Sequence, residues 1–185
     1  LAYINIFLPD EHMASSESLY FFPVSKLSDF QIPKEVLENP GTSSVWFYQD
    51  LLSVPFLVNN SYHITNSVSC CRVLKHPGTD SIKYAYIIYL DASEFSSILQ
   101  EIFHDNQITS YILTDNGKIV ASNNPSLLSA SLDEEKLDFL YNKGDSLKKR
   151  AHTNYHTTTL RNGWLQVTEI PDSYIMQNTH ILIKS

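Results

Sequence analysis

The chain has 185 residues, 18% of them charged, and a formal net charge of −7 at pH 7. The acidic balance argues against nucleic-acid binding, because such proteins displace counterions with clustered Lys and Arg. Eleven Tyr, nine Phe and two Trp supply ample material for a hydrophobic core, which excludes a disordered chain, and five Gly are few for glycine-rich nucleotide loops.

The first half of the chain is predicted to be mostly sheet. Three segments have the apolar, β-branched and aromatic composition of strands: residues 2–8, 67–74 and 83–90. The strands at 67–74 and 83–90 flank a predicted turn at 76–80. A loop-rich stretch from Glu11 to Gly41 contains a short helix at 34–38, and an aromatic segment begins at Trp46.

Two features bear on the context of the chain. Cys70 and Cys71 are neighbours in a predicted strand, where adjacent side chains point to opposite faces, so we expect no disulfide framework. No stretch reaches the roughly 18–20 apolar residues that span a bilayer. The chain opens on an apolar run at 1–8 and closes on another at 181–183, and we therefore expect it to be an excised piece of a longer protein.

An amphipathic helix is predicted at 92–104. Asp91 comes directly before it and is suited to cap it, with Glu94 three residues later as in a capping box. The apolar residues of this segment recur at helical spacing: Phe95, Ile98, Leu99, Ile102 and Phe103. The helix therefore has one face to bury.

Two Asn-Gly pairs predict hairpins in the second half. Asn116-Gly117 lies between strands expected at 111–114 and 118–121. Asn162-Gly163 lies between strands expected at 151–160 and 164–170. Asn-Gly is the strongest short hairpin signal, and we expect turns with positive φ at both pairs.

The remaining elements of the second half are helices and loops. A helix is expected at 131–142, with Ser131 and Glu134 spaced as a capping box. The basic run 148–150 is interpreted as a surface loop. Pro171 ends the last strand, and a further helix is expected from Asp172 onward.

These elements predict an α+β fold with two antiparallel-sheet modules of β-meander type joined by a helix. The order differs from the βαβ alternation that builds a parallel sheet. We expect the boundaries to be as follows: first module 1–92, connecting helix 92–107, second module 108–175, and a segment leading away at 176–185.

No group of residues predicts catalysis, a metal or a cofactor. His152 and His156 lie four apart in a predicted strand, about 13 Å from each other, which is too far for shared coordination. The sequence contains no nucleophile elbow, dinucleotide fingerprint or phosphate loop. We therefore expect structural or surface histidines, no cofactor, and no enzyme activity in this chain.

The aromatic residues of the first module suggest a small-molecule pocket, which is typically apolar with a few polar groups that fix orientation. The candidates are Trp46, Tyr48 and Tyr62, with Arg72 and Asp91 as polar groups. Ordinary core packing explains the aromatic residues as well. Arg72 can equally be a surface strand residue, and Asp91 can be only a helix cap.

The order of several segments resembles a known family. Tyr89-Leu90-Asp91 runs into an amphipathic helix, and then follow the hairpin at 111–122, the segment Gly163 to Val167, and Ile170-Pro171. This order is similar to that of the double Cache sensor domains of bacterial receptor histidine kinases, chiefly those of Gram-positive bacteria. The similarity covers nearly the whole chain, most securely from about Trp46 to Ile175.

The resemblance implies two PAS-like modules on the outer side of a membrane. The distal module would bind a small ligand, and the proximal one would pass a shift to a second transmembrane helix after 176–185. The full-length receptor would be a homodimer held in the membrane by flanking helices, with its kinase in the cytoplasm. Rival interpretations are a chemoreceptor or cyclic-dinucleotide enzyme with the same outer domain, a secreted carbohydrate- or protein-binding module, and an enzyme of unknown type.

Amino-acid-binding members of the family carry an Arg-x-Trp-Tyr element, a later Tyr, and an Asp at the end of the last distal strand. Trp46 and Asp91 match this pattern, and Tyr62 takes the place of the later Tyr. Ser44 stands at the Arg position and Phe47 at the first Tyr position. Without the Arg, a bidentate grip on a carboxylate is lost, so an amino-acid ligand is not supported.

Overall fold

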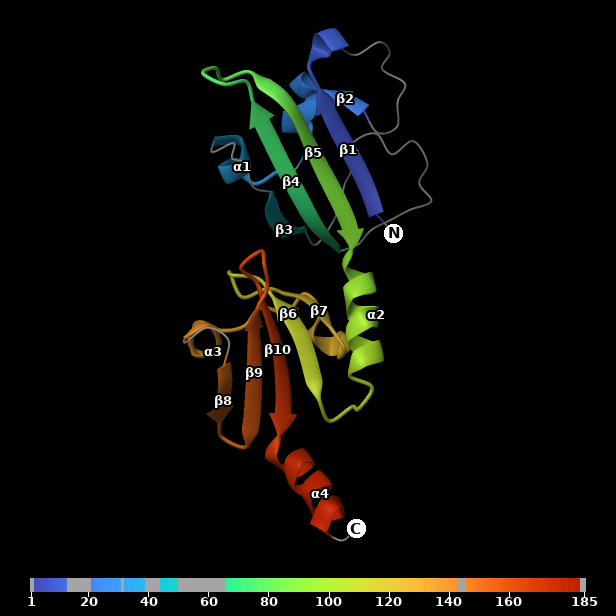
Figure 1. Cartoon of the computed structure of the whole chain (residues 1–185), viewed down its shortest axis with the longest axis vertical. Coiled ribbons are helices and arrows are strands. Elements are labelled where there is room, and N and C mark those ends of the chain that lie inside the picture. Colours follow the sequence, from blue (N-terminus) through green and yellow to red (C-terminus); the bar gives the residue numbers. More distant parts are fainter. Residues whose placement is uncertain are drawn as a thin grey trace. The chain divides into compact units, whose positions relative to one another are not determined.

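A computed structural model describes residues 2–12, 21–30, 32–38, 44–49, 66–142 and 146–183. The chain divides into two compact units, Leu1–Asp91 and Ala92–Ser185. Each unit contains one five-stranded sheet with a small number of helices (Figure 1). The predicted α+β fold of two sheet modules is confirmed.

The first sheet has the strand order β2-β1-β5-β4-β3. Its strands are β1 (Ala2–Leu8), β2 (Phe21–Pro23), β3 (Val45–Gln49), β4 (Ser67–Lys75) and β5 (Ile82–Asp91). The three strands predicted for this unit are β1, β4 and β5. The meander expected here was wrong, because β1 pairs with β5 and the short β2 runs parallel to β1.

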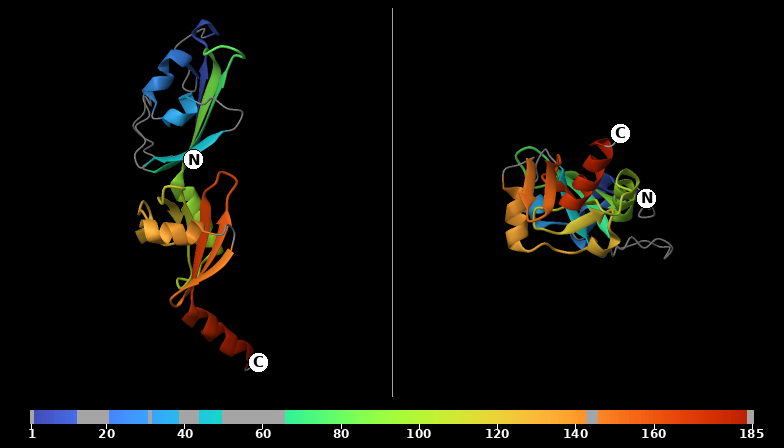
Figure 2. Two further views of the ribbon diagram at one scale, coloured as in Figure 1. Left: turned by 90° about the vertical axis from the view of Figure 1, so that its left-hand side faces the viewer. Right: turned by 90° about the horizontal axis from the view of Figure 1, so that it is seen from below.

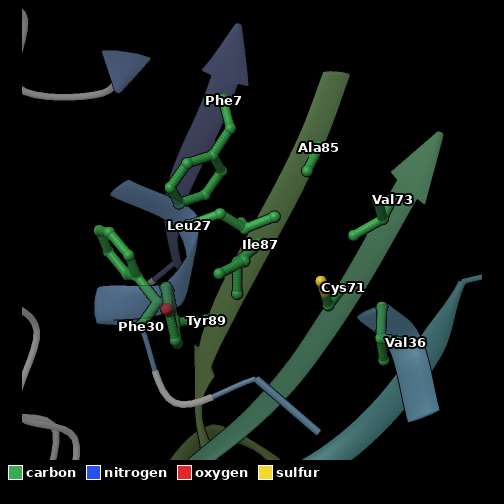
Figure 3. Packing of buried hydrophobic residues seen from close by; sticks show 9 residues of the cluster. All are labelled: Phe7, Leu27, Phe30, Val36, Cys71, Val73, Ala85, Ile87 and Tyr89. Atoms are coloured by element: carbon green, nitrogen blue, oxygen red, sulfur yellow. The ribbon is translucent and has the colours of Figure 1, made fainter. Parts of the chain in front are cut away.

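One face of the first sheet carries the core of the unit. The 3₁₀ helix η2 (Val24–Asp29) and helix α1 (Lys34–Glu38) lie over this face, which we call the core face (Figures 2 and 3). Leu27, Val36 and Ile87 belong to the buried hydrophobic cluster on this face. Phe30 meets Phe7 edge to face, with ring centroids 4.9 Å apart. Helix α1 lies where the sequence predicted it.

The second sheet has the strand order β7-β6-β10-β9-β8. Its strands are β6 (Thr109–Leu113), β7 (Ile119–Ser122), β8 (Ser146–Arg150), β9 (Thr153–Thr159) and β10 (Leu165–Pro171). Tyr111, Leu113 and Val167 are at most 1% exposed and pack with Leu140 of helix α3 (Glu134–Tyr141). Both predicted hairpins are present.

The helix predicted after Asp91 is α2 (Ala92–Ile102), and it packs on β7 of the second sheet. Leu99 is buried, and the buried Ser96 hydroxyl accepts a hydrogen bond from the Ser122 amide at 3.2 Å. These contacts explain why α2 belongs to the second compact unit. The last helix is α4 (Asp172–Ile183), which begins at the predicted residue. Among the described helices, none combines the length and the hydropathy that crossing a bilayer requires.

The two Asn-Gly turns share one geometry that differs from the expected one. Gly117 and Gly163 have φ of 83° and 86°, whereas neither Asn residue has a positive φ. Each Gly amide donates to the carbonyl three residues earlier, at 3.0 and 2.9 Å. This is a type I turn followed by a left-handed Gly, a geometry in which only the Gly needs positive φ. Positive φ at the Asn residues was wrong.

Two local predictions in the second unit were also wrong. The cap of α3 is Asp133, whose carboxylate accepts from the Lys136 amide at 2.7 Å, while Ser131 forms an isolated bridge with Lys118. The basic run 148–150 belongs to the edge strand β8 and is not a loop. Each of its three charges has a partner: Lys148 donates to the Leu140 carbonyl, Lys149 to Asp172 and Arg150 to Glu135.

Candidate functional site

Strand register shows which side chains share the core face of the first sheet. Opposed residues in antiparallel strands point to the same side and lie within contact distance. Three rows cross the face: Gln49, Ser67 and Asp91; Phe47, Ser69, Tyr89 and Tyr3; and Val45, Cys71, Ile87 and Asn5. The next row, with Val73, Ala85 and Phe7, is apolar (Figure 3). The face therefore changes from apolar to polar along the strands.

The polar end of the core face contains buried hydroxyl groups. Ser67 and Ser69 are both 0% exposed, and their Oγ atoms lie 2.9 Å apart. The Ser69 hydroxyl also donates to Oε1 of Gln49 at 3.4 Å. These contacts satisfy both hydroxyls, as buried polar groups require. Asp91 continues the same row at the end of β5.

Asn5 is the unusual member of this group. It is 5% exposed, and its Nδ2 atom is buried without a hydrogen-bond partner within the described ranges. An unsatisfied buried donor costs about 1–3 kcal/mol. The core face thus presents an amide donor suited to an acceptor that the described residues do not supply.

Titration of the neighbouring groups is suppressed. Burial raises the pKa of the Tyr89 phenol, and a polar contact with the Asn5 side chain, which falls short of hydrogen-bond geometry, only partly opposes this shift. Burial also raises the pKa of the Cys71 thiol to about 12, with a smaller contribution from Cys70. Both groups are therefore neutral near pH 7, and Cys71 is unsuited to act as a thiolate nucleophile.

The Lys and Arg residues of the first unit lie outside the three rows. Lys26 pairs with Asp29 at 3.6 Å, and Lys75 pairs with Asp80 at 3.2 Å. The other three are Lys34 on α1, Arg72 on the opposite face of the sheet, and Lys83 at the start of β5. Within the described residues the polar end has one carboxylate, Asp91.

The structure separates the residues that the sequence singled out. Asp91 lies at the polar end of the core face, whereas Trp46, Tyr48 and Arg72 point to the other side of the sheet, which we call the outer face. Trp46 is 37% exposed there. Tyr62 lies outside the described residues. Whether these five residues bind a ligand stays a prediction.

Sequence reasoning missed Asn5, Gln49, Ser67 and Ser69. Two sequence patterns could have indicated these residues. Ser67 and Ser69 are polar residues at alternate positions of a strand, and Asn5 is a single polar residue within an apolar strand. Both faces of β4 and β5 carry apolar residues, so alternation alone did not show which face is buried.

Metal binding has no support in the described part of the chain. No three His, Cys, Asp or Glu side chains gather there in a group that could hold an ion. His152 lies 3.8 Å from a carboxylate oxygen of Asp172, the first residue of α4. These two side chains do not form a group of three possible ligands with any other described residue.

Comparisons with known proteins connect this architecture with sensory domains. No family model and no curated protein matches the chain. The periplasmic sensory domain of the Campylobacter jejuni chemoreceptor Tlp1 matches with a TM-score of 0.59 and 9% identity, over 82% of this chain and 58% of that one. The extracellular domain of a protein described as the histidine kinase rpHK1S-Z16 matches with a TM-score of 0.55 and 10% identity. The match covers 94% of this chain and 71% of that one.

A third match has a bound ligand. The ligand-binding domain of the Pseudomonas aeruginosa PAO1 amino acid chemoreceptor PctC, solved with GABA, gives a TM-score of 0.54 and 10% identity, over 91% of this chain and 72% of that one. These identities show a shared fold. The sensory-domain fold implied by the sequence resemblance is therefore confirmed, while an origin in Gram-positive bacteria gains no support.

Proposed function

We propose that this chain is the extracytoplasmic sensory domain of a membrane receptor and binds a small molecule at the polar end of the first core face. The observation that carries this proposal is the buried amide of Asn5, whose Nδ2 donor has no partner within the described ranges. Domains with this fold serve as ligand-binding parts of receptors. In this proposal the chain acts by binding and has no catalytic role.

The ligand would act by favouring one arrangement of the domain over another, since only differential affinity can shift a conformational equilibrium. The proposed output is α4, whose first residue is firmly held. The Asp172 carboxylate accepts from Lys149 Nζ at 2.9 Å and from Asn154 Nδ2 at 2.7 Å, and the Asp172 amide donates to the His152 carbonyl at 2.8 Å. A change in the second sheet would reach α4 through these bonds.

The finer assignments belong to the same proposal. We assign residues 1–92 to the membrane-distal module and 108–175 to the proximal one, with 92–107 as connecting helix and 176–185 leading to a transmembrane helix. The full-length receptor is proposed to be a homodimeric histidine kinase of a two-component system. A chemoreceptor is the second candidate, because the matched domains include chemoreceptors as well as a histidine kinase.

The test begins with a thermal-shift screen of small metabolites on the purified chain, since a ligand that binds only the folded state raises the midpoint. Calorimetry then measures the affinity of each hit for wild type and for Asn5→Ala. Loss of a hydrogen bond to a buried polar group predicts roughly tenfold weaker binding or more. Asn106→Ala, at an exposed position of the second unit, is the matched control. A ligand that binds both variants and wild type equally would place the site elsewhere.

A further inference from the structure

The outer face of the first sheet contains a groove that the proposed site does not use. Its volume is about 500 Å³, and it lies along β1 and β5. The apolar part of its lining comes from both strands and the residue after β1: Ile4, Ile6, Leu8, Pro9, Tyr84 and Tyr86. A volume of this size is typical of small-molecule sites.

The groove is apolar because of strand alternation. Ile4 and Ile6 alternate along β1 with Asn5, so they point away from the polar end of the core face. Across the sheet, Ile6 is opposite Tyr86 and Ile4 is opposite Ile88. Ile4 is 40% exposed although it lies in the middle of a strand. The groove floor and the candidate site thus occupy opposite sides of the same strands.

Among the described residues of the groove lining, the charged ones are all basic or potentially basic. His12 belongs to the 3₁₀ helix η1 (Asp10–His12), His76 to the β4–β5 turn, and Lys83 to β5. None of the described lining residues is acidic. The adjacent Lys75–Asp80 ion pair is neutral as a whole, and Asp10 accepts a hydrogen bond from the Ser25 amide.

Arg72 adds to the positive charge of this face. It is opposite Tyr86, a groove residue, in the pairing of β4 with β5. Its Nε atom is buried and has no hydrogen-bond partner in the described part of the chain. The groove therefore combines an apolar floor with cationic groups at its margin, which is complementary to an anion that carries an apolar tail.

We propose that this groove binds a soluble alkyl-chain anion, such as a medium-chain carboxylate. The chain would lie on Ile4 and Ile6 along β1, and the carboxylate would lie near Lys83 and the two imidazoles. This is a second site, separate from the proposed sensory site, because it lies on the other face of the sheet. It goes beyond the proposed function and can be tested independently.

The test compares octanoate with octylammonium, which have the same chain and opposite charges. Isothermal titration of the 185-residue chain should show octanoate binding at least about fivefold more tightly, as expected for a partly exposed cationic site. Lys83→Glu should remove or reverse this preference. Ile4→Asp, at a position that is 40% exposed, should abolish octanoate binding because it places a carboxylate in the floor.

Two matched variants control for unspecific effects. Lys34→Glu makes the same charge change on α1, and Ile102→Asp makes the same replacement at an exposed position of α2. Both should bind octanoate like wild type. Absence of octanoate binding, equal affinity for both probes, or unchanged binding in Ile4→Asp would overturn the proposal. Binding to anionic vesicles without binding of octanoate would assign the groove to a membrane surface and would also overturn it.

Discussion

The core faces of the two sheets carry polar groups in different ways. In the second unit, the buried Tyr111 hydroxyl donates to Glu169 at 2.7 Å, and Lys136 from α3 donates to the same carboxylate oxygen at 2.8 Å. In the first unit, Asn5 keeps a buried donor without a partner among the described residues. The Tyr111, Lys136 and Glu169 side chains therefore satisfy one another, although the buried hydroxyls of Tyr141 and Ser146 in the same unit also have no partner among the described residues.

The partly buried carboxylate of the second face has a cation beside it. Lys136 lies 6.0 Å from the ring centroid of Tyr111 and 5.7 Å from that of Tyr155, so its charge is held over two aromatic rings beside Glu169. Burial, followed by the negative charge of Glu169, raises the pKa of the Tyr111 phenol. The Tyr111–Glu169–Lys136 network thus satisfies its own polar groups, whereas the Asn5 donor of the first face has no partner among the described residues.

The largest effect is expected from breaking the core beneath the second network. Leu140 is 0% exposed, and Leu140→Ala should lower the free energy of unfolding by about 2–5 kcal/mol through lost burial and a cavity. Hydrogen exchange should report faster opening of β6, β9 and β10. If the two units are independent, β1 and β5 should keep their protection. Equal loss in both sheets would contradict two separate cores.

A smaller loss of stability is expected when the hydrogen-bond network of Tyr111, Glu169 and Lys136 is broken. Lys136→Met leaves Glu169 and Tyr111 without their cation, and Glu169 is only 21% exposed in its side chain. Removing one partner of a buried pair is costly, and partial exposure reduces this to about 1–3 kcal/mol. Urea unfolding measures the change, and Lys34→Met at an exposed position is the control. Equal stability of both variants would show that the pair contributes nothing.

Urea unfolding of a variant of the first face should show no loss of stability, in contrast to Lys136→Met. Asn5→Leu replaces the amide by an apolar group of similar size, which should be neutral or stabilise the ligand-free protein by up to about 1 kcal/mol. Ser69→Val, at a satisfied hydroxyl, should destabilise it by about 1 kcal/mol. Urea midpoints compare the two. A clear loss of stability in Asn5→Leu would mean that the amide is satisfied in the folded protein, and the comparison of the faces would fail.

Much of this comparison was accessible from the sequence, but not all of it. Asn-Gly pairs, the stripe of α2 and the β-forming runs are local signals, and they located the hairpins, the helix and most strands of both sheets, but not β2, β3 or β8. The pairing of β1 with β5 is a long-range contact with no local signal. Trp46 and Arg72 were chosen by residue type. Only strand register shows that their side chains lie on the other face of the sheet from Asp91. Side-chain chemistry could be read from the sequence, whereas the face to which it belongs could not.

The smallest predicted effect concerns the proposed output helix and depends on pH. Hydrogen bonds from Lys149 and Asn154 lower the pKa of Asp172 below its ordinary value of 3.8. Because the folded value lies below the unfolded one, this carboxylate stabilises the fold above pH 3.8 and loses that contribution as the pH falls through the folded value. Asp172→Asn should therefore weaken protection of the first turn of α4 at pH 7 but match wild type in strong acid. Asp80→Asn, at an exposed residue paired with Lys75, is the control and should leave α4 unchanged at both pH values. Hydrogen exchange at the two pH values measures the difference, and equal loss of protection in Asp172→Asn at both would mean that the carboxylate charge does not hold the helix.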